Sequence, residues 1–230
     1  MTAPFYVSPE QWYQDKAEYA RKGIARGKPI VALDFEHGIV LLAENRSAGL
    51  RKLAEIYDRI GFAAVGKFDE YENLRKGGVR YADMRGYSFS REDVAAAGLA
   101  NEYSTALGNI FTREMKPFEV ELLVCEVGDE KNTYYRILFD GSIFDQANFV
   151  SIGGDREKIE RILKEDWKPN MPLGDAVQLG IRALQRGNER GTEGSGKLGY
   201  DGLEIALLDR RRQARRFKRL RGDEIDKLLG

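Results

Sequence analysis

Two apolar segments on either side of a short polar turn constrain the fold of this chain more than any other feature. They lie between residues 26 and 45, are rich in β-branched residues, and are separated by Glu36, His37 and Gly38. Apolar runs joined by a short turn that ends in glycine are typical of a β-hairpin. The sequence therefore predicts an antiparallel strand pair near the start of the chain, with His37 as a surface residue of its turn.

Composition limits the classes of protein that need to be considered. The chain has 230 residues, with 37 basic and 37 acidic side chains, so its formal net charge is zero. This balance argues against a dedicated nucleic-acid binder and leaves no net self-repulsion to oppose oligomer formation. No apolar run reaches the length of a membrane span and no leader pattern is present, so we expect a soluble, cytoplasmic protein. The single cysteine, Cys125, lies in an apolar segment and is predicted to be a core thiol.

A helix is predicted ahead of the hairpin, over residues 8–26. Ser8 is a good N-cap, Pro9 suits the first helical position, and Gln11 could complete a capping box. The helix needs a surface on which to bury its apolar stripe, and either its own domain or a neighbouring subunit could provide one. The stripe recurs at helical spacing and consists of Tyr13, Ala17, Ala20 and Ile24.

The remaining chain alternates between blocks of strands and pairs of helices. Segregated blocks of this kind favour antiparallel sheets covered by helices, and we predict an α+β fold, a four-layer α-β-β-α sandwich. No internal repeat or long linker divides the chain, so residues 27–230 are expected to form one sandwich domain. The expected elements are an amphipathic connector at 50–59, strands at 61–66, 118–122, 133–139, 148–152, 203–208 and 215–220, and helices at 68–84, 90–110, 156–167, 172–186 and 223–229.

Three local patterns together point to a family. Ser8-Pro9 precedes Glu18-Tyr19-Ala20, the hairpin occupies 27–45, and Lys52-Leu53 lies fourteen residues before Gly66. With these features the chain closely resembles proteasome α subunits of the actinobacterial kind, over essentially all of residues 8–208. The resemblance implies a sandwich of the N-terminal-nucleophile hydrolase type, with the helix at 8–26 as an addition and residues 1–7 as a terminal tail.

The resemblance also allows a comparison with the active members of the proteasome family. In those members a glycine is cleaved from a following threonine, which then attacks peptides, whereas here Lys28 follows Gly27. The positions that match the supporting serine and aspartate are Gly154 and Gly187, while Glu44 and Lys52 match retained charged positions. A lysine offers no hydroxyl or thiol for acyl transfer. We therefore expect a subunit that is not itself an enzyme, with no catalytic residue, metal or cofactor.

For an α subunit, the resemblance implies a homo-heptameric ring that stacks on proteasome β subunits. It also implies docking of an AAA ATPase ring, which inserts its C-terminal carboxylate and delivers proteins tagged with the prokaryotic ubiquitin-like modifier. The implied activator-binding residues are Lys52, Gly27, Glu18 and Gly66. The implied gate to the axial pore consists of Thr2, Ala3, Pro4, Phe5, Tyr6, Val7, Ser8 and Pro9. Without the resemblance, the residues favour Lys52 as a solvated helix lysine, and residues 1–7 could be a frayed terminus.

Two alternative functions are compatible with the residues. The chain could be a self-contained hydrolase whose nucleophile appears after processing near Thr2 or Ser8. It could also be a nucleic-acid-binding module that uses the basic run 210–221, although such a run is more often a solvated edge strand. The segment 191–198 imitates a phosphate-binding loop, but Leu198 replaces the required hydroxyl residue and the loop follows a helix instead of a strand.

Overall fold

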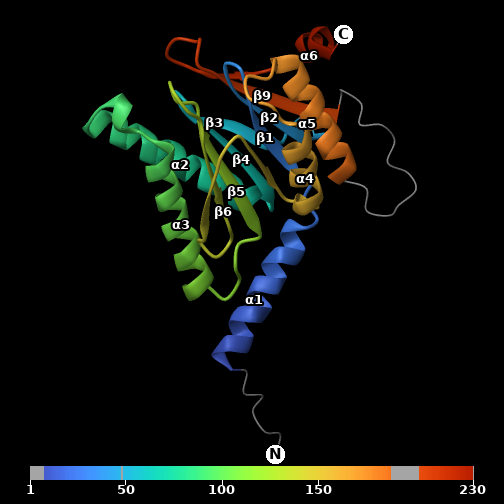
Figure 1. The fold of residues 1–230 in the computed structure, drawn as a ribbon. Coiled ribbons are helices and arrows are strands. Elements are labelled where there is room, and N and C mark those ends of the chain that lie inside the picture. The colour runs from blue at the N-terminus through green and yellow to red at the C-terminus, as the bar shows by residue number, and fades with distance from the viewer. Residues whose placement is uncertain (1–7, 48, 188–201, 230) are drawn as a thin grey trace, which may run out of the picture.

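The computed structural model describes residues 8–47, 49–187 and 202–229, and they form two five-stranded antiparallel sheets packed face to face between helices (Figure 1). The first sheet has the order β10-β9-β2-β1-β8. Its strands are β1 (Ile30–Phe35), β2 (Gly38–Glu44), β8 (Phe149–Ile152), β9 (Leu203–Asp209) and β10 (Phe217–Arg219). The second sheet has the order β3-β4-β5-β6-β7. Its strands are β3 (Leu53–Tyr57), β4 (Ile60–Gly66), β5 (Val120–Glu126), β6 (Thr133–Ile137) and β7 (Ile143–Gln146).

Helix pairs cover the outer faces of both sheets, which confirms the predicted sandwich. The pair α2 (Phe68–Ser88) and α3 (Ala96–Arg113), with the short 3-10 helix η1 (Arg91–Asp93) between them, packs on the second sheet. The pair α4 (Arg156–Asp166) and α5 (Leu173–Gly187) packs on the first sheet, where α6 (Gly222–Leu229) contacts α5. Within the described residues, no helix is both long enough and apolar enough to cross a membrane.

The β1–β2 hairpin lies inside the first sheet, between β9 and β8, and both of its faces are buried. This position explains why its sequence is almost continuously apolar and does not alternate with polar residues. One face of each strand contributes to the core between the sheets, and the other face packs against α4 and α5. Side chains toward the second sheet include Ile30, Ala32, Ile39 and Leu41, and those toward the helices include Val31, Leu33, Val40 and Leu42.

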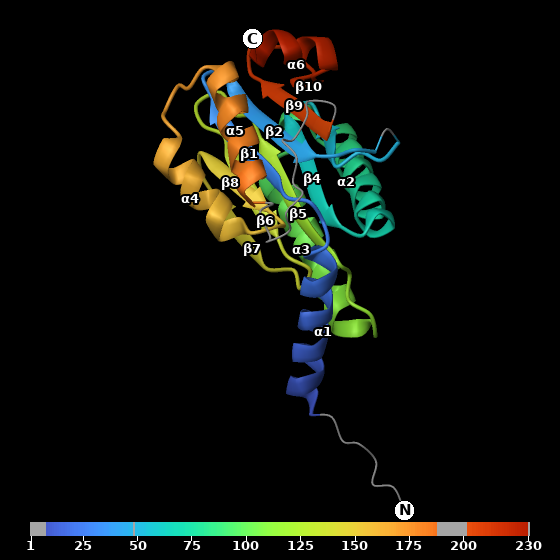
Figure 2. The same cartoon turned by 90° about the vertical axis from the view of Figure 1, so that its right-hand side faces the viewer.

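Helix α1 (Pro9–Ile24) extends away from the sandwich, at the end opposite α6 (Figure 2). Its C-terminal half packs on its own domain, where Ala20 and Ile24 join the core between the sheets. In the middle of α1, the Lys16 Nζ donates to the carbonyl oxygens of Phe111 and Glu114, at 2.5 and 2.6 Å. The second half of the apolar stripe on α1 is therefore buried against the same chain.

Two of the sequence predictions about local structure are wrong. Residues 50–59 do not form a helical connector, because Leu53–Tyr57 is the edge strand β3. Ser90 does not start the long helix: its Oγ accepts from the Glu92 N–H and caps η1. Helix α3 starts at Ala96 instead, where the carboxylate of Glu126 accepts from the Ala96 N–H at 2.8 Å. A side chain thirty residues further along the chain supplies this cap, so no local pattern marks it.

Smaller differences concern one cap and one strand. Ser8 caps α1 as predicted, since its Oγ accepts from the Gln11 N–H, but the Gln11 side chain bonds Asp15 and does not complete a capping box. Strand β7 was not predicted because it is a short edge strand whose residues remain partly or fully exposed. Cys125 is fully buried, as expected.

Candidate functional site

Three charged residues meet where the first three strands begin or end. Lys28 lies just before β1, Glu44 is the last residue of β2, and Lys52 directly precedes β3. The antiparallel pairing of β1 with β2 brings Glu44 beside the residues that precede β1. The Lys28 Nζ lies 3.6 Å from Glu44 Oε1, and the Lys52 Nζ donates to the Lys28 carbonyl oxygen at 3.3 Å. The structure thus brings together Lys28, Glu44 and Lys52 as the sequence comparison implied.

A fourth residue, Glu204 on β9, holds the chain at Lys52 in place. Its carboxylate accepts from the backbone N–H groups of Lys52 (3.1 Å) and Leu53 (3.4 Å) and from the Asn45 amide (2.7 Å). The same carboxylate forms an ion pair with Arg219. The sequence analysis missed this residue, although an acidic residue between Leu203 and Ile205, inside the otherwise apolar run 203–208, was a usable signal.

The electrostatic environment of Lys52 is unusual for a lysine. The pKa of Lys52 is lowered to about 8, mainly by burial; Glu44 and Glu204 oppose this shift, and the Lys28 cation adds a smaller lowering. In the described part of the chain, no carboxylate oxygen lies within 4.0 Å of the Lys52 Nζ. The site therefore presents a half-buried amine whose hydrogen-bond acceptor is a backbone carbonyl, an arrangement suited to receiving an external anion.

Two of the other residues implied in activator binding lie next to each other, and a third lies apart. A Cβ atom added to Gly27 would lie 2.4 Å from Val65 Cγ1 and 3.3 Å from the Gly66 backbone nitrogen. Gly66 itself has a φ of +119°, and a Cβ there would lie 1.8 Å from the Glu119 carbonyl oxygen, so only glycine fits. Glu18 is exposed on α1, where its carboxylate pairs with Lys22 at 2.7 Å.

The two glycines that the resemblance matches to the supporting serine and aspartate have different surroundings. Gly154 has a φ of +59° and packs against Pro29, the residue that follows Lys28. Gly187 ends α5, where an added Cβ would lie 2.3 Å from Ile159 Cγ1 of α4. The structure therefore places Gly154 beside the Lys28 segment, whereas the close contact of Gly187 is with the helix layer.

The residues implied in the gate fall mostly outside the described part of the chain. Thr2, Ala3, Pro4, Phe5, Tyr6 and Val7 lie outside the described residues, as does the loop 191–198. Ser8 and Pro9 form the start of α1, with the Ser8 Oγ engaged in the helix cap.

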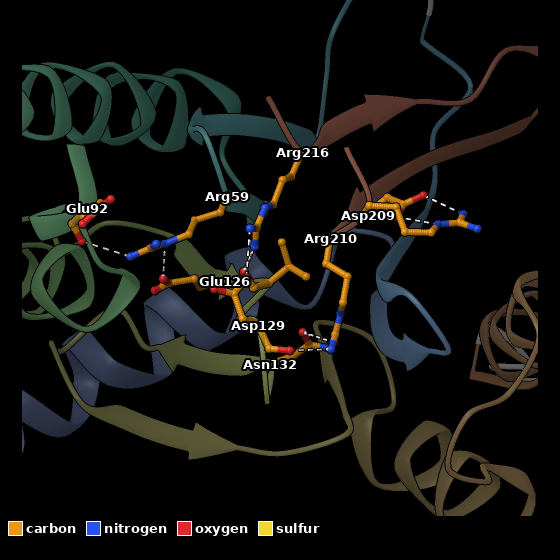
Figure 3. A network of polar contacts seen from close by, with 10 residues as sticks. Arg59, Glu92, Glu126, Asp129, Asn132, Asp209, Arg210 and Arg216 are labelled. Carbon is orange, nitrogen blue, oxygen red and sulfur yellow. Dashed lines mark hydrogen bonds and ion pairs between the residues drawn. The ribbon is translucent and has the colours of Figure 1, made fainter. Parts of the chain in front are cut away.

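Most basic side chains of the run 210–221 form ion pairs or hydrogen bonds with other groups of the same chain. Figure 3 shows Arg216 reaching Asp129, and Arg210 bonding the Asn132 side chain. The guanidinium of Arg211 pairs with Asp209 at 2.8 Å, and Arg215 pairs with Glu55. Pairing of this kind leaves little unbalanced positive charge for phosphate groups, which does not favour nucleic-acid binding.

Among the described residues, the histidine, cysteine and carboxylate side chains offer neither a metal site nor a reactive thiol. No group of three or more His, Cys, Asp or Glu side chains among them could hold a metal ion. The buried Cys125 thiol has its pKa raised by desolvation, which disfavours the reactive thiolate. His37 lies in the hairpin turn, with its Nε2 3.5 Å from Glu36 Oε1.

Comparisons with known proteins assign this chain to a family. The family model described as proteasome subunit matches residues 24–198. Proteins named proteasome subunit alpha are 51% identical in Streptosporangium roseum and Kineococcus radiotolerans and 52% identical in Streptomyces coelicolor. Each alignment covers all of this chain and 87%, 98% and 91% of the respective relative. The chain therefore belongs to the proteasome subunit family, and within that family it is similar to the actinobacterial α subunits.

Proposed function

We propose that the chain is a non-catalytic α-ring subunit of a cytoplasmic proteasome core particle. The observation that carries this proposal is the cluster at Lys28: where active family members place their nucleophile, a lysine amine pairs with Glu44. Lys52, which matches the lysine that tunes that nucleophile, donates to a carbonyl oxygen of the backbone. Neither group provides the hydroxyl or thiol that covalent peptide hydrolysis of this type requires.

In this function the chain forms a homo-heptameric ring that stacks on β subunits, which perform the proteolysis. Residues 1–7 act as the gate of the axial pore and admit proteins tagged with the prokaryotic ubiquitin-like modifier. The direction of α1 supports this proposal, because its first residues lie far from the sandwich (Figure 2). A tail that starts there can reach beyond the body of the subunit.

Lys52 receives the C-terminal carboxylate of an AAA ATPase ring in this proposal. A carboxylate requires a cation and hydrogen-bond donors, and a lysine without a carboxylate partner in the described residues supplies the cation. Gly27 and Gly66 support the site indirectly, because a Cβ atom on either would collide with Val65 or Glu119 of the same chain, and glycine therefore allows the close packing of the segment beside Lys28. Glu18, which is exposed on α1, would contribute to activator binding from this helix.

The assembly is tested by electron microscopy of the purified chain, alone and with its β partner, combined with peptidase assays. We expect seven-membered rings in the complex, and peptide cleavage only when β subunits are present. Deletion of residues 1–7 should increase turnover of an unfolded casein-like substrate by the assembled particle. Unchanged turnover would argue against a gate, and cleavage by the chain alone would support the alternative of a self-contained hydrolase.

Docking is tested separately with Lys52→Ala in the assembled particle. We expect loss of stimulation by the ATPase activator while cleavage of small peptides by the β subunits is retained. The matched control is Lys168→Ala, which removes an exposed lysine far along the chain from the site. Stimulation that survives in Lys52→Ala would contradict the docking role.

A further inference from the structure

The two carboxylates whose charges act on Lys52, Glu44 and Glu204, are both engaged by other groups. Glu44 lies 3.6 Å from the Lys28 Nζ and 3.8 Å from the Arg46 Nε. The Glu204 carboxylate accepts from backbone N–H groups and pairs with Arg219. Among the residues that the structure describes, Lys52 Nζ is thus held by one hydrogen bond of 3.3 Å to a carbonyl oxygen, and its side chain remains partly accessible.

This arrangement meets the chemical conditions for a nucleophilic lysine. An amine becomes nucleophilic near neutral pH when it is desolvated and lies beside another cation, because both effects favour its neutral form. Lys52 is half-buried, and this burial is the main cause that lowers its pKa; the Lys28 cation adds a smaller lowering, which Glu44 and Glu204 oppose. Lys28 and Arg46, whose side chains are 54% and 80% exposed, both lie within 4.0 Å of Glu44, one of the two carboxylates that act on Lys52.

We propose that Lys52 is a site of lysine acylation and that its acyl donors are small acyl phosphates. The neutral Nζ attacks the carbonyl carbon, a C–N bond forms, and the bond from that carbon to the phosphate oxygen breaks. Inorganic phosphate leaves with the electron pair, and the proton lost from the nitrogen passes to phosphate or water. Lys28 and Arg46 attract the dianionic donor and stabilise the departing phosphate.

Acylation would convert the Lys52 ammonium into an uncharged amide. In the function proposed above, this change would remove the cation that receives the activator's carboxylate, so acylation would weaken docking. That consequence rests on the proposed function, whereas the reactivity of the amine does not.

The reactivity is tested by incubating the purified full-length chain with acetyl phosphate at pH 7.5 and following acetylation of each lysine by peptide mass spectrometry. Lys168, an exposed lysine, serves as the internal reference. We expect Lys52 to be acetylated about tenfold faster than Lys168, because a larger fraction of its amine is neutral. Equal or slower acetylation of Lys52 would overturn the proposal.

The role of the neighbouring cation is tested with Lys28→Ala. Loss of this cation should slow acetylation of Lys52 severalfold and leave the rate at Lys168 unchanged, because Lys28 both lowers the Lys52 pKa and attracts the donor. An unchanged rate at Lys52 would contradict the part assigned to Lys28. Arg46→Ala should have a smaller effect in the same direction, since Arg46 is more exposed.

The functional consequence is measured with a peptide that ends in the C-terminal sequence of the activator, with its amidated form as control. The acetylated particle should bind the free-acid peptide more weakly than the untreated particle. If Lys52 is acetylated rapidly but peptide binding is unchanged, the reactivity is confirmed and the docking function fails. If acetylation is slow but Lys52→Ala abolishes binding, the docking function is supported and the acylation site is rejected.

Discussion

The two ends of the β1–β2 hairpin both bury a charged group, but they treat it differently. At the turn end, Asp34 accepts hydrogen bonds from the Tyr134 hydroxyl and from the Asn132 amide at 2.7 Å. Arg210 in turn donates to the Asn132 side chain at 3.1 Å, as part of the network in Figure 3. At the other end, Lys52 has a backbone carbonyl as its acceptor at 3.3 Å.

This difference separates a structural network from a binding site. Buried polar groups that have all their partners stabilise a unique packing, whereas a buried charge with incomplete partners costs stability unless a ligand completes it. Burial raises the pKa of Asp34, but its hydrogen bonds oppose that shift. The turn end therefore holds the two sheets together, and the end at Lys52 is the place where we propose that an anion binds.

The largest expected effect comes from Glu204→Ala. This change removes a buried carboxylate that pairs with Arg219 and accepts hydrogen bonds from Asn45 and from two backbone N–H groups. We expect a loss of about 3–5 kcal/mol in the free energy of unfolding, measured by denaturant titration. Glu160→Ala, which removes a partly exposed partner of Arg156, should cost below about 1 kcal/mol. Equal losses in both variants would show that Glu204 does not anchor the site.

The hydrogen-bond network at the turn end of the hairpin is tested by Tyr134→Phe, which removes the hydroxyl group of a fully buried ring. Asp34 would lose its Tyr134 hydrogen bond inside the core, so we expect a loss of about 1–3 kcal/mol in the free energy of unfolding. The neighbouring Tyr135→Phe is the matched control, because Tyr135 points to the other face of β6 and is partly exposed. Its effect should stay within about 0.5 kcal/mol.

At the end of the hairpin near Lys52, the lowered pKa of this lysine should make the stability of the protein depend on pH. With a folded pKa of about 8 against an unfolded value near 10.5, the unfolded chain binds more protons between these values. The free energy of unfolding must then rise with pH through this window. Relative to Lys52→Met, we expect a rise of about 1–2 kcal/mol between pH 7.5 and 9.5, measured by denaturant titration at each pH. Parallel pH profiles for the two proteins would show that Lys52 has an ordinary environment.

The smallest expected effect is that of Arg215→Ala in the basic run. Arg215 pairs with Glu55 at 2.5 Å, but its side chain is 72% exposed. We expect a change of at most about 0.5 kcal/mol that shrinks further at high salt. Binding to DNA or RNA in a mobility-shift assay should be absent in wild type and variant alike. A salt-sensitive shift by the wild type would revive the nucleic-acid alternative.

The fold was predictable from the sequence because its main signals are local. Apolar periodicity and glycine turns specify the hairpin and the long helices, and the family resemblance located Lys28, Glu44 and Lys52. The segment around β3 was assigned wrongly, because Leu53 and Ile56 are three residues apart and fit a helical stripe as well as a short strand. Tertiary context, namely pairing with β4, decides between the two.

The missed parts of the site depend on residues that are distant in the sequence. Glu204 reaches Lys52 from 152 positions further along the chain, a relation that no spacing rule can reveal. The sequence shows that Glu204 is an unusual residue for its strand, but not which groups it binds. Likewise, the pairing of the basic run with Asp129 and Glu55 appears only in the folded chain.

Helix α3 has no side-chain cap of its own at its N-terminus, and distant residues bind both of its ends. Glu126 from β5 binds the first turn, and Lys16 from α1, 95 to 98 positions away, binds the last carbonyl groups. Neither contact can form until the chain has closed long loops, and such closure is slow. The ends of this helix should therefore be among the last parts of the subunit to become protected from hydrogen exchange during folding. An early-folding α3 would leave its two terminal turns open until α1 and β5 dock on it.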